Sequence, residues 1–220
     1  CIFATMKKVY FDSAATTQLR SEVIRCISEV LKTEYGNPSS THAYGRSAKS
    51  LLENARKEIA KHLNVSASEI IFTSGGTEAD NLILNSCVRD LGVTRIISSK
   101  IKHHAVLYAI KMLQEKYDVS VDYVKLDECG HIDYDHLEEL LKSSDKKTLV
   151  SLMHVNNEVG NVLEIDKVAK LCLQNDALFH SDTVQSVGHY EVDFSETPIH
   201  FAAVAAHKFH GPKGAGRSER

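Results

Sequence analysis

The sequence predicts an α/β protein whose mostly parallel sheet is flanked by helices. Two observations support this prediction. Short apolar runs, typical of buried strands, alternate along the chain with segments of helical spacing. Polar residues also follow directly after several of those runs. Because parallel strands need crossover connections, helices cover both faces of such a sheet, and its ligands bind at the carboxyl ends of the strands.

Each element is expected where its apolar period is clear. The first helical pattern stops at Tyr35-Gly36-Asn37-Pro38, since Gly and Pro end helices. The turn Gly75-Gly76 separates a strand from a helix that runs to about Leu91. The other expected helices are 19–31, 48–63, 104–117, 133–142 and 165–173, and the expected strands are 69–73, 95–98, 119–125, 148–153, 177–181 and 201–206, the last of these being the final strand.

Composition narrows the class of partners. The chain has 220 residues, is 43% hydrophobic and carries a formal net charge of −3. This balance argues against a nucleic-acid partner and against a polybasic membrane surface, and no apolar run reaches the roughly 18 residues of a membrane span. The start has no signal-peptide pattern. Met6 is the more natural start, so we expect residues 1–5 to be non-native.

The five cysteines are scattered and form no CxxC pair, which argues against a disulfide framework and against a cysteine zinc site. Cys26, Cys87 and Cys172 each fall in an apolar helical pattern. Free cysteine behaves as a small hydrophobic residue, so we expect these three to be buried. A reducing, cytoplasmic location fits this pattern best.

The turn Ser74-Gly75-Gly76-Thr77 joins a predicted strand to a predicted helix. Its backbone N–H groups and the Thr77 hydroxyl would suit an anion at a helix N-terminus. A tight turn with a capping hydroxyl explains the same residues equally well. The turn lacks the lysine of a P-loop and is not GxGxxG, which disfavours a nucleoside triphosphate or a dinucleotide.

Four further strand-end residues suggest chemistry. Asp182 follows an apolar strand and could keep a heterocyclic nitrogen protonated, although it could equally cap a turn. Gln185 could donate to a phenolic oxygen. Lys208 follows the apolar run at 201–206 and, if desolvated, could form a Schiff base, although a surface lysine is the commoner outcome. His103 could stack on a planar ring or move protons, or simply begin a helix.

Taken together, these groups match the needs of pyridoxal 5′-phosphate. The turn would hold its phosphate, Asp182 its ring nitrogen, Gln185 its phenolic oxygen and Lys208 its aldehyde. A zinc site is the alternative from another class, listed by its four possible ligands: His103, His180, Asp182 and His207. Zinc would leave the lysine and the phosphate turn unexplained, so we expect no metal.

The chain closely resembles the NifS/IscS-type cysteine desulfurases, which are class V aminotransferase-like enzymes of fold type I. The resemblance runs in order from about Val9 to Gly216. It is carried by YFDSAATT from Tyr10, GNPSS from Gly36 with His42, SGGTEADN from Ser74, His103 with AVL from Ala105, MHVNNEVG from Met153, HSDTVQS from His180, and His207-Lys208 with GPKG from Gly211.

The resemblance implies roles for five residues around the cofactor ring. Lys208 matches the lysine that holds the cofactor as a Schiff base, and Asp182 matches the acid that pairs with the ring nitrogen. Gln185 and Asn157 match groups near the phenolic oxygen. His103 matches the histidine that stacks on the ring and handles protons.

The resemblance also implies roles for the remaining site residues. Gly76, Thr77 and His207 match contacts to the phosphate, and Asn37 lies in a motif near the substrate pocket. The implied reaction converts L-cysteine to L-alanine and leaves sulfur on an enzyme cysteine as a persulfide. A homodimer and a sulfur-acceptor protein are the implied partners.

The chain departs from the family pattern in three places. Ala205 stands where the family often has a serine that touches phosphate, which removes one hydrogen bond of about 0.5–1.5 kcal/mol. None of its cysteines matches the sulfur-accepting cysteine, and the substrate-carboxylate arginine is missing with the small domain. The polar residues after Gly216 replace an expected apolar strand and suggest a frameshift, a premature stop or an artificial end.

These departures set the expected organisation and the alternatives. Residues 1–18 would form an N-terminal arm and residues 19–220 a pyridoxal-phosphate-binding large domain, incomplete at its C-terminus. Besides a cysteine desulfurase, the chain could be a selenocysteine lyase or another class V aminotransferase or lyase. It could also be an inactive cofactor-binding chain that lacks the catalytic cysteine.

Overall fold

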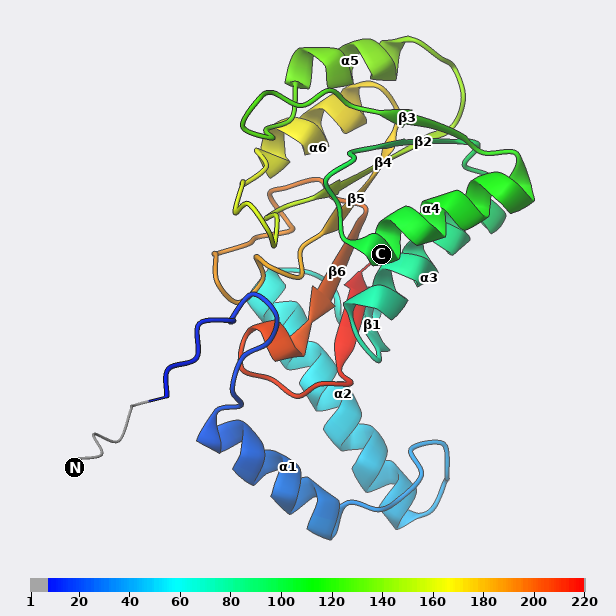
Figure 1. Cartoon of the computed structure of the whole chain (residues 1–220). Helices are drawn as coiled ribbons and strands as arrows, with labels where there is room; N and C mark the ends of the chain where they lie inside the picture. The colour runs from blue at the N-terminus through cyan, green and yellow to red at the C-terminus, as the bar shows by residue number, and fades with distance from the viewer. Residues whose placement is uncertain (1–7, 220) are drawn as a thin grey trace, which may run out of the picture.

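A seven-stranded sheet forms the centre of the computed structural model, which describes residues 8–219. The order of its strands is β1-β7-β6-β5-β4-β2-β3 (Figure 1). The expectations for residues 1–5 lie outside the described part of the chain. The strands are β1 Ile70–Thr73, β2 Arg95–Ser98, β3 Ser120–Tyr123, β4 Thr148–Met153, β5 Leu178–Asp182, β6 Phe201–Ala205 and β7 Gly216–Glu219.

Five neighbouring strands, β6, β5, β4, β2 and β3, pair in parallel, which confirms the predicted fold class. β7 lies between β6 and β1 and is antiparallel to both. The prediction that 201–206 is the final strand was therefore wrong. Its residues after Gly216, Arg217-Ser218-Glu219, carry no apolar period, so the hydrophobic pattern could not reveal a strand that is held by backbone pairing on two sides.

Helices cover both faces of the sheet, and Figure 1 shows α3 and α4 along one side with α5 and α6 near the other. One core lies between the sheet and α3 and α4, and it includes Leu84, Ile96 and Ile110. A second core lies between the sheet and α5 and α6, and it includes Leu137 and Phe179. The helices are α1 Ser21–Thr33, α2 Ala43–Leu63, α3 Gly76–Arg89, α4 His104–Tyr117, α5 Tyr134–Lys142 and α6 Ile165–Gln174, with short 3₁₀ turns η1 Ala67–Glu69 and η2 Ala206–Lys208.

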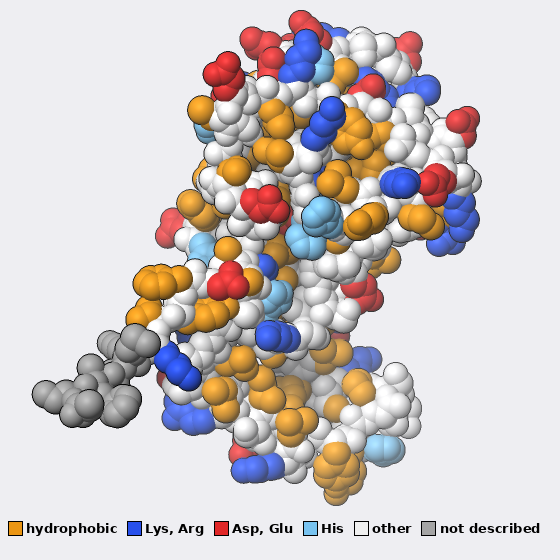
Figure 2. Space-filling model, in the orientation of Figure 1, with side chains coloured by type: hydrophobic (Ala, Val, Ile, Leu, Met, Phe, Trp, Pro, Cys, Tyr) orange, Lys and Arg blue, Asp and Glu red, His pale blue; other side chains and the backbone are white. Residues whose placement is uncertain are grey.

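The helices α1 and α2 extend away from the sheet at the bottom of Figure 1. No residue of α1 is buried. Cys26 is exposed there, so its predicted burial was wrong, whereas Cys87 and Cys172 are buried as predicted. The apolar period of α1 is real, but the residues that the structure describes cover its apolar face only partly. Figure 2 shows hydrophobic side chains gathered over α1 and α2. The large exposed ones on these helices and their connection are Ile24, Leu31, Tyr35, Tyr44, Leu51 and Leu52.

The carboxyl ends of the strands meet at one edge. Gly216 pairs with Thr73 of β1 on one side and with Ala205 of β6 on the other. Asp182 pairs with Met153 at the end of β4, and in β6 it pairs with Ala203. Thus the segments that follow β1, β5 and β6 emerge side by side. Among residues 8–219, no helix is both long and apolar enough to cross a bilayer.

Replacing Phe179 by alanine tests the core between the sheet and α6. The side chain is fully buried. Its loss should lower the free energy of unfolding by about 3–5 kcal/mol, because a large cavity would remain. Chemical denaturation of the chain measures this value. Leu173→Ala is the control, since Leu173 on α6 is 63% exposed, and it should change stability far less. Equal losses in the two variants would contradict the described core.

Candidate active site at the carboxyl ends of the strands

Asp182 ends β5 in a dry environment. Along one face of β5, apolar Leu178 packs against the core beneath α3 and α4, and His180 and Asp182 follow on the same face. Asp182 is 2% exposed, and its Oδ1 accepts a hydrogen bond of 3.0 Å from the backbone N–H of Val184. Burial, together with the charge of nearby Asp80, raises the pKa of Asp182 to about 6. A cation that binds next to a carboxyl group held in this way stabilises its ionised form.

Lys208 lies beside this acid. It ends η2, directly after β6, and its side chain is half-buried. Burial lowers the pKa of Lys208, while the charges of Asp182 and Asp12 act in the opposite direction. The charge of Asp182 therefore acts on the Lys208 amine. A lowered pKa increases the share of neutral amine, which is the nucleophilic form.

The segment before α1 closes one side of the site. The backbone oxygen of Ala14 accepts hydrogen bonds from Lys208 Nζ and, at 2.9 Å, from Gln185 Nε2. Thr17 donates twice to the backbone oxygen of His207, through its N–H and its Oγ1, each at 2.9 Å. The sequence analysis missed this part of the site. The family motif YFDSAATT, which contains Ala14 and Thr17, was the available signal, whereas the arm has no helical or strand period that would place it at the strand ends.

His207 is tied to the same arm. Its Nδ1 lies 3.2 Å from Thr16 Oγ1. Burial lowers its pKa, and the nearby charges of Lys208 and Lys213 lower it further. Both effects favour the neutral imidazole, in which one ring nitrogen donates and the other accepts.

The predicted phosphate turn lies at the same edge. α3 begins at Gly76, so the N–H groups of its first turn point out of the helix without intrahelical partners. A Cβ on Gly76 would lie 2.7 Å from Val184 Cγ2, two residues past Asp182. A Cβ on Gly216 would lie 2.3 Å from Gly75 Cα, so β7 also needs glycine there. Nothing lies within 4 Å of a Cβ built on Gly75, which leaves open space beside the turn.

Three other predicted residues are less tightly connected. His103 is the N-cap of α4, where its Nδ1 accepts from the N–H of Ala105 at 3.2 Å, and it is exposed. Asn157 is half-buried in the segment after β4. Asn37 is exposed, and its Oδ1 accepts from the N–H of Ser39 in the α1–α2 connection, which Figure 1 shows apart from η2. The structure does not bring Asn37 to the strand ends, so its role remains a prediction.

A second group of polar residues, which the sequence analysis did not identify as a unit, lies behind Asp182. It contains Asp80 on α3, Lys102 before α4, Ser151 on β4 and His180 on β5, all buried. Burial raises the pKa of Asp80 to about 7 and lowers that of Lys102 to about 8. In the sequence, this group is signalled only by single polar residues, such as Ser151 and His180, within apolar strands.

The donor set fits pyridoxal phosphate better than zinc. A buried acid, a partly desolvated amine and an open helix N-terminus next to a glycine turn lie on adjacent strand ends. His180 is instead enclosed, with Nδ1 2.9 Å from Ser151 Oγ. Over residues 8–219, no three His, Cys, Asp or Glu side chains are arranged to hold a metal ion. The four residues weighed as zinc ligands therefore do not form a donor set.

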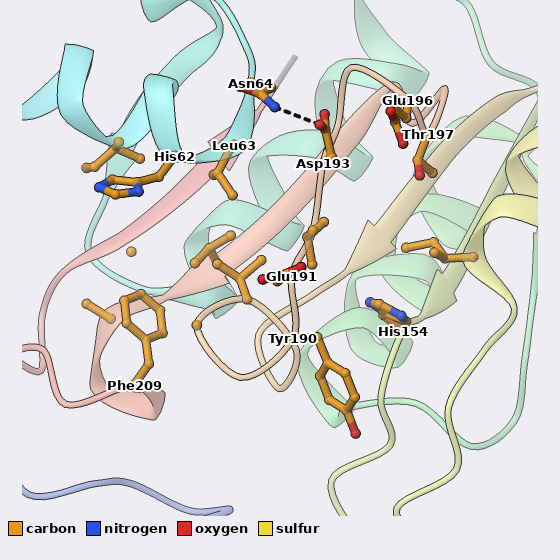
Figure 3. A pocket seen from close by; sticks show the side chains of 18 of the residues that line it. His62, Leu63, Asn64, His154, Tyr190, Glu191, Asp193, Glu196, Thr197 and Phe209 are labelled. Carbon is orange, nitrogen blue, oxygen red and sulfur yellow. Dashed lines mark hydrogen bonds between the residues drawn. The ribbon is translucent and has the colours of Figure 1, made fainter.

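A wide groove lies elsewhere on the described chain. It has a volume of about 1270 Å³ and lies between the end of α2, α6 and the segment 187–197. Figure 3 shows His154, Tyr190 and Phe209 around it, and a hydrogen bond of 2.6 Å from Asn64 to Asp193. Val204 and Ala206 line this groove, whereas Ala205 faces α3. Alternation along the strand therefore places the groove and the strand-end site on opposite faces of the sheet.

Comparison with known proteins agrees with this site. A family model described as aminotransferase class-V matches residues 9–217. The chain is 42% identical over 212 residues to the cysteine desulfurase IscS of Dictyoglomus turgidum, and this covers 96% of the chain and 53% of that relative. The chain belongs to the aminotransferase class-V family, whose members depend on pyridoxal phosphate.

Two solved structures show the same fold. A NifS-like protein superposes with a TM-score of 0.91 at 37% identity, covering 97% of this chain and 59% of its own. The structure of SspA in complex with cysteine has a TM-score of 0.90 at 30% identity, covering 96% of this chain and 61% of its own. The chain thus spans about half the length of the curated relatives it matches. The family resemblance expected from the motifs is confirmed.

Asp182→Asn separates the stability of this site from its function. Because burial raises the folded-state pKa of Asp182 from 3.8 to about 6, the folded chain holds the proton more tightly than the unfolded chain. As pH rises from 4 through 6, the wild-type chain must lose stability relative to an asparagine variant. We expect Asp182→Asn to be more stable by on the order of 2 kcal/mol at pH 8 and nearly equal at pH 4.

The measurement is denaturant unfolding of the two cofactor-free chains across this pH range. Asp176→Asn is the control, because Asp176 lies on the surface before β5 and should show no such pH-dependent difference. A wild-type chain that gains stability over Asp182→Asn as pH rises would contradict the burial of an unpaired carboxylate.

Proposed function

We propose that this chain is the pyridoxal-phosphate-binding part of a cysteine desulfurase, which converts L-cysteine to L-alanine and passes the sulfur to a cysteine thiol. The observation that carries the proposal is the position of Lys208 and Asp182 after the neighbouring strands β6 and β5, where the charge of Asp182 acts on the pKa of Lys208, with the Gly75-Gly76 turn at the same edge of the sheet. The relatives named cysteine desulfurase and the neighbour whose title names cysteine support the choice of substrate.

Each residue has a physical task in this proposal. The first turn of α3, with Gly76 and Thr77, binds the phosphate through N–H and hydroxyl groups. Lys208 supplies the amine that attaches the cofactor. Asp182 keeps the ring nitrogen protonated, and the bound cofactor then supplies the electron sink for the substrate carbanion. Because the site is partly dry, these charge interactions are stronger than they would be in water.

Four residues complete the proposed site. Gln185 and Asn157 orient the phenolic oxygen, and His207 contributes to phosphate binding. His103 moves a proton at its Nε2, since its Nδ1 is held by the N–H of Ala105. His103 is exposed, so substrate and water reach this ring without a change in the fold.

The sulfur-accepting step needs a thiolate. Cys87 and Cys172 are buried, and burial raises the pKa of each thiol to about 12. These two are therefore inert at neutral pH. Cys26, on α1, and Cys129, between β3 and α5, are exposed. We propose that the accepting thiol belongs to another segment or another protein.

The proposal also covers the partners, the location and the organisation of the chain. We infer a homodimer, a sulfur-acceptor protein and a cytoplasmic location, with residues 1–18 as an arm and 19–220 as the large domain. The exposed apolar side chains of α1 and α2 support a dimer, because large unpartnered apolar surfaces commonly mark interfaces.

A second candidate is an inactive chain that binds the cofactor without turnover, and the buried or remote cysteines favour it. A selenocysteine lyase would use the same cofactor site. Incubation of the cofactor-loaded chain with L-cysteine or L-selenocysteine and excess dithiothreitol, whose thiols accept the sulfur or selenium and reduce it, followed by measurement of alanine, separates these candidates. Alanine from cysteine supports the desulfurase, alanine from selenocysteine alone supports the lyase, and none from either supports the inactive chain.

Lys208→Ala tests the attachment of the cofactor. The wild-type chain mixed with pyridoxal phosphate should keep a visible absorbance band after gel filtration, and borohydride should fix the cofactor mass on Lys208. The variant should lose both, because it lacks the amine. Lys111→Ala is the control, since the Lys111 side chain is 70% exposed on α4, and it should behave like the wild type. A cofactor retained by Lys208→Ala would contradict the assignment.

Thr77→Val tests the phosphate turn. Loss of one hydroxyl contact should raise the dissociation constant of pyridoxal phosphate roughly tenfold, which is about 1.4 kcal/mol. Equilibrium dialysis gives this constant. Thr33→Val, at the exposed end of α1, should leave it unchanged. The prediction is wrong if both variants bind like the wild type.

A further inference from the structure

The buried polar group behind Asp182 has charges that the proposed roles do not use. Asp80 is 2% exposed, Lys102 is 8% exposed and His180 is fully enclosed. They come from α3, from the segment before α4 and from β5. Moving ions into a dry interior costs several kcal/mol for each ion unless partners compensate it. The buried charges of this group therefore need partners of opposite charge nearby.

Short contacts link the members of this buried group. Lys102 Nζ donates to Ser151 Oγ at 2.6 Å, and Ser151 Oγ lies 2.9 Å from His180 Nδ1. An ammonium group only donates, so Ser151 Oγ accepts from Lys102, and in one of the two tautomers that this contact allows its own proton goes to His180 Nδ1. The His180 proton is then on Nε2, which lies 3.2 Å from Asp80 Oδ1. Both of these atoms are buried and neither makes a hydrogen bond within residues 8–219, so the charge on Asp80 is not compensated by His180.

The charges of the group do not cancel. Asp182 follows His180 on the same face of β5, and the charge of Lys102 acts on both Asp80 and Asp182. The pKa is about 7 for Asp80, about 6 for Asp182 and about 8 for Lys102. Near pH 7.5 both carboxyl groups are therefore mostly ionised and Lys102 is mostly protonated. One negative charge therefore remains in the dry group. Lys208, after β6, is the next cation facing it.

We propose that Asp80 and Lys102 are positioning residues that leave this buried group with one negative charge for the protonated ring nitrogen of pyridoxal phosphate. This inference rests on the proposed function. Asp182 and Asp80 both stabilise the charge of Lys102, so the second carboxylate leaves the group with one negative charge in excess for the ring. Without Asp80, Lys102 would neutralise Asp182, and a docking cation would leave an uncompensated positive charge in a dry site.

Two variants and two ligands test the charge balance. Asp80→Asn removes the compensating carboxylate and should weaken binding of pyridoxal phosphate near pH 7.5 by about tenfold or more, the effect of at least one pKa unit. Adding Lys102→Met to Asp80→Asn removes the excess positive charge and should restore most of the affinity. If Asp80 had a purely structural role, a second substitution in the core would not restore the affinity.

The second ligand is a pyridoxal phosphate analogue in which CH replaces the ring nitrogen. It presents no cation, so the wild type, Asp80→Asn and the double variant should bind it equally. The inference is overturned if Asp80→Asn binds pyridoxal phosphate like the wild type, if the double variant is as weak as the single one, or if the analogue loses affinity in parallel. A wild-type chain that takes up no pyridoxal phosphate overturns the proposed function itself.

Lys102→Gln gives a readout that needs neither cofactor nor a folded Asp80→Asn variant. Glutamine keeps a donor for Ser151 but removes the charge that stabilises the Asp80 carboxylate. Carbon-13 NMR of the carboxyl groups in the cofactor-free chain should show the pKa of Asp80 raised by about one unit or more. Lys100→Gln, an exposed neighbour, is the control and should leave it unchanged. An unaltered Asp80 titration in Lys102→Gln refutes the proposed compensation.

Discussion

Removal of water from the end of β5 is the constraint on which the rest of this structure depends. Asp182 and His180 continue a strand face whose earlier part packs in the core beneath α3 and α4. The same packing that excludes water from the core therefore excludes it from an acid. A carboxylate there is unfavourable in the free chain and favourable once a cation is bound. Stability and function oppose one another at this position.

The topology of the sheet converts this local property into a site. β7 enters between β1 and β6 in the reverse direction, and its Gly216 lies against Gly75. This close approach fixes the turn before α3 next to the end of β6, where Lys208 follows. The arm before α1 then binds across His207 and Lys208 through Thr17 and Ala14. Segments nearly 200 residues apart in sequence thus hold one lysine.

The described chain encloses one face of its sheet more completely than the other. The strand-end site lies on the face covered by α3 and α4, whereas a wide groove opens beside α2 and α6. The chain spans about half the length of its curated relatives. Its strand-end residues, from the turn at Gly75 to Lys208, nevertheless all lie within the region matched by the class-V family.

The sequence by itself determined the fold class, with its alternating strands and helices, and the family resemblance, and it predicts which residues would serve the cofactor. It did so because hydrophobic period reports burial directly, and because Lys208 and Asp182 each follow an apolar strand. Only the tertiary structure decided that Cys26 is exposed, that residues 216–219 are an interior strand, and that Asp80, Lys102 and His180 meet behind Asp182. Those outcomes depend on contacts between distant segments, whose backbone pairing and buried charges leave no periodic trace in the chain.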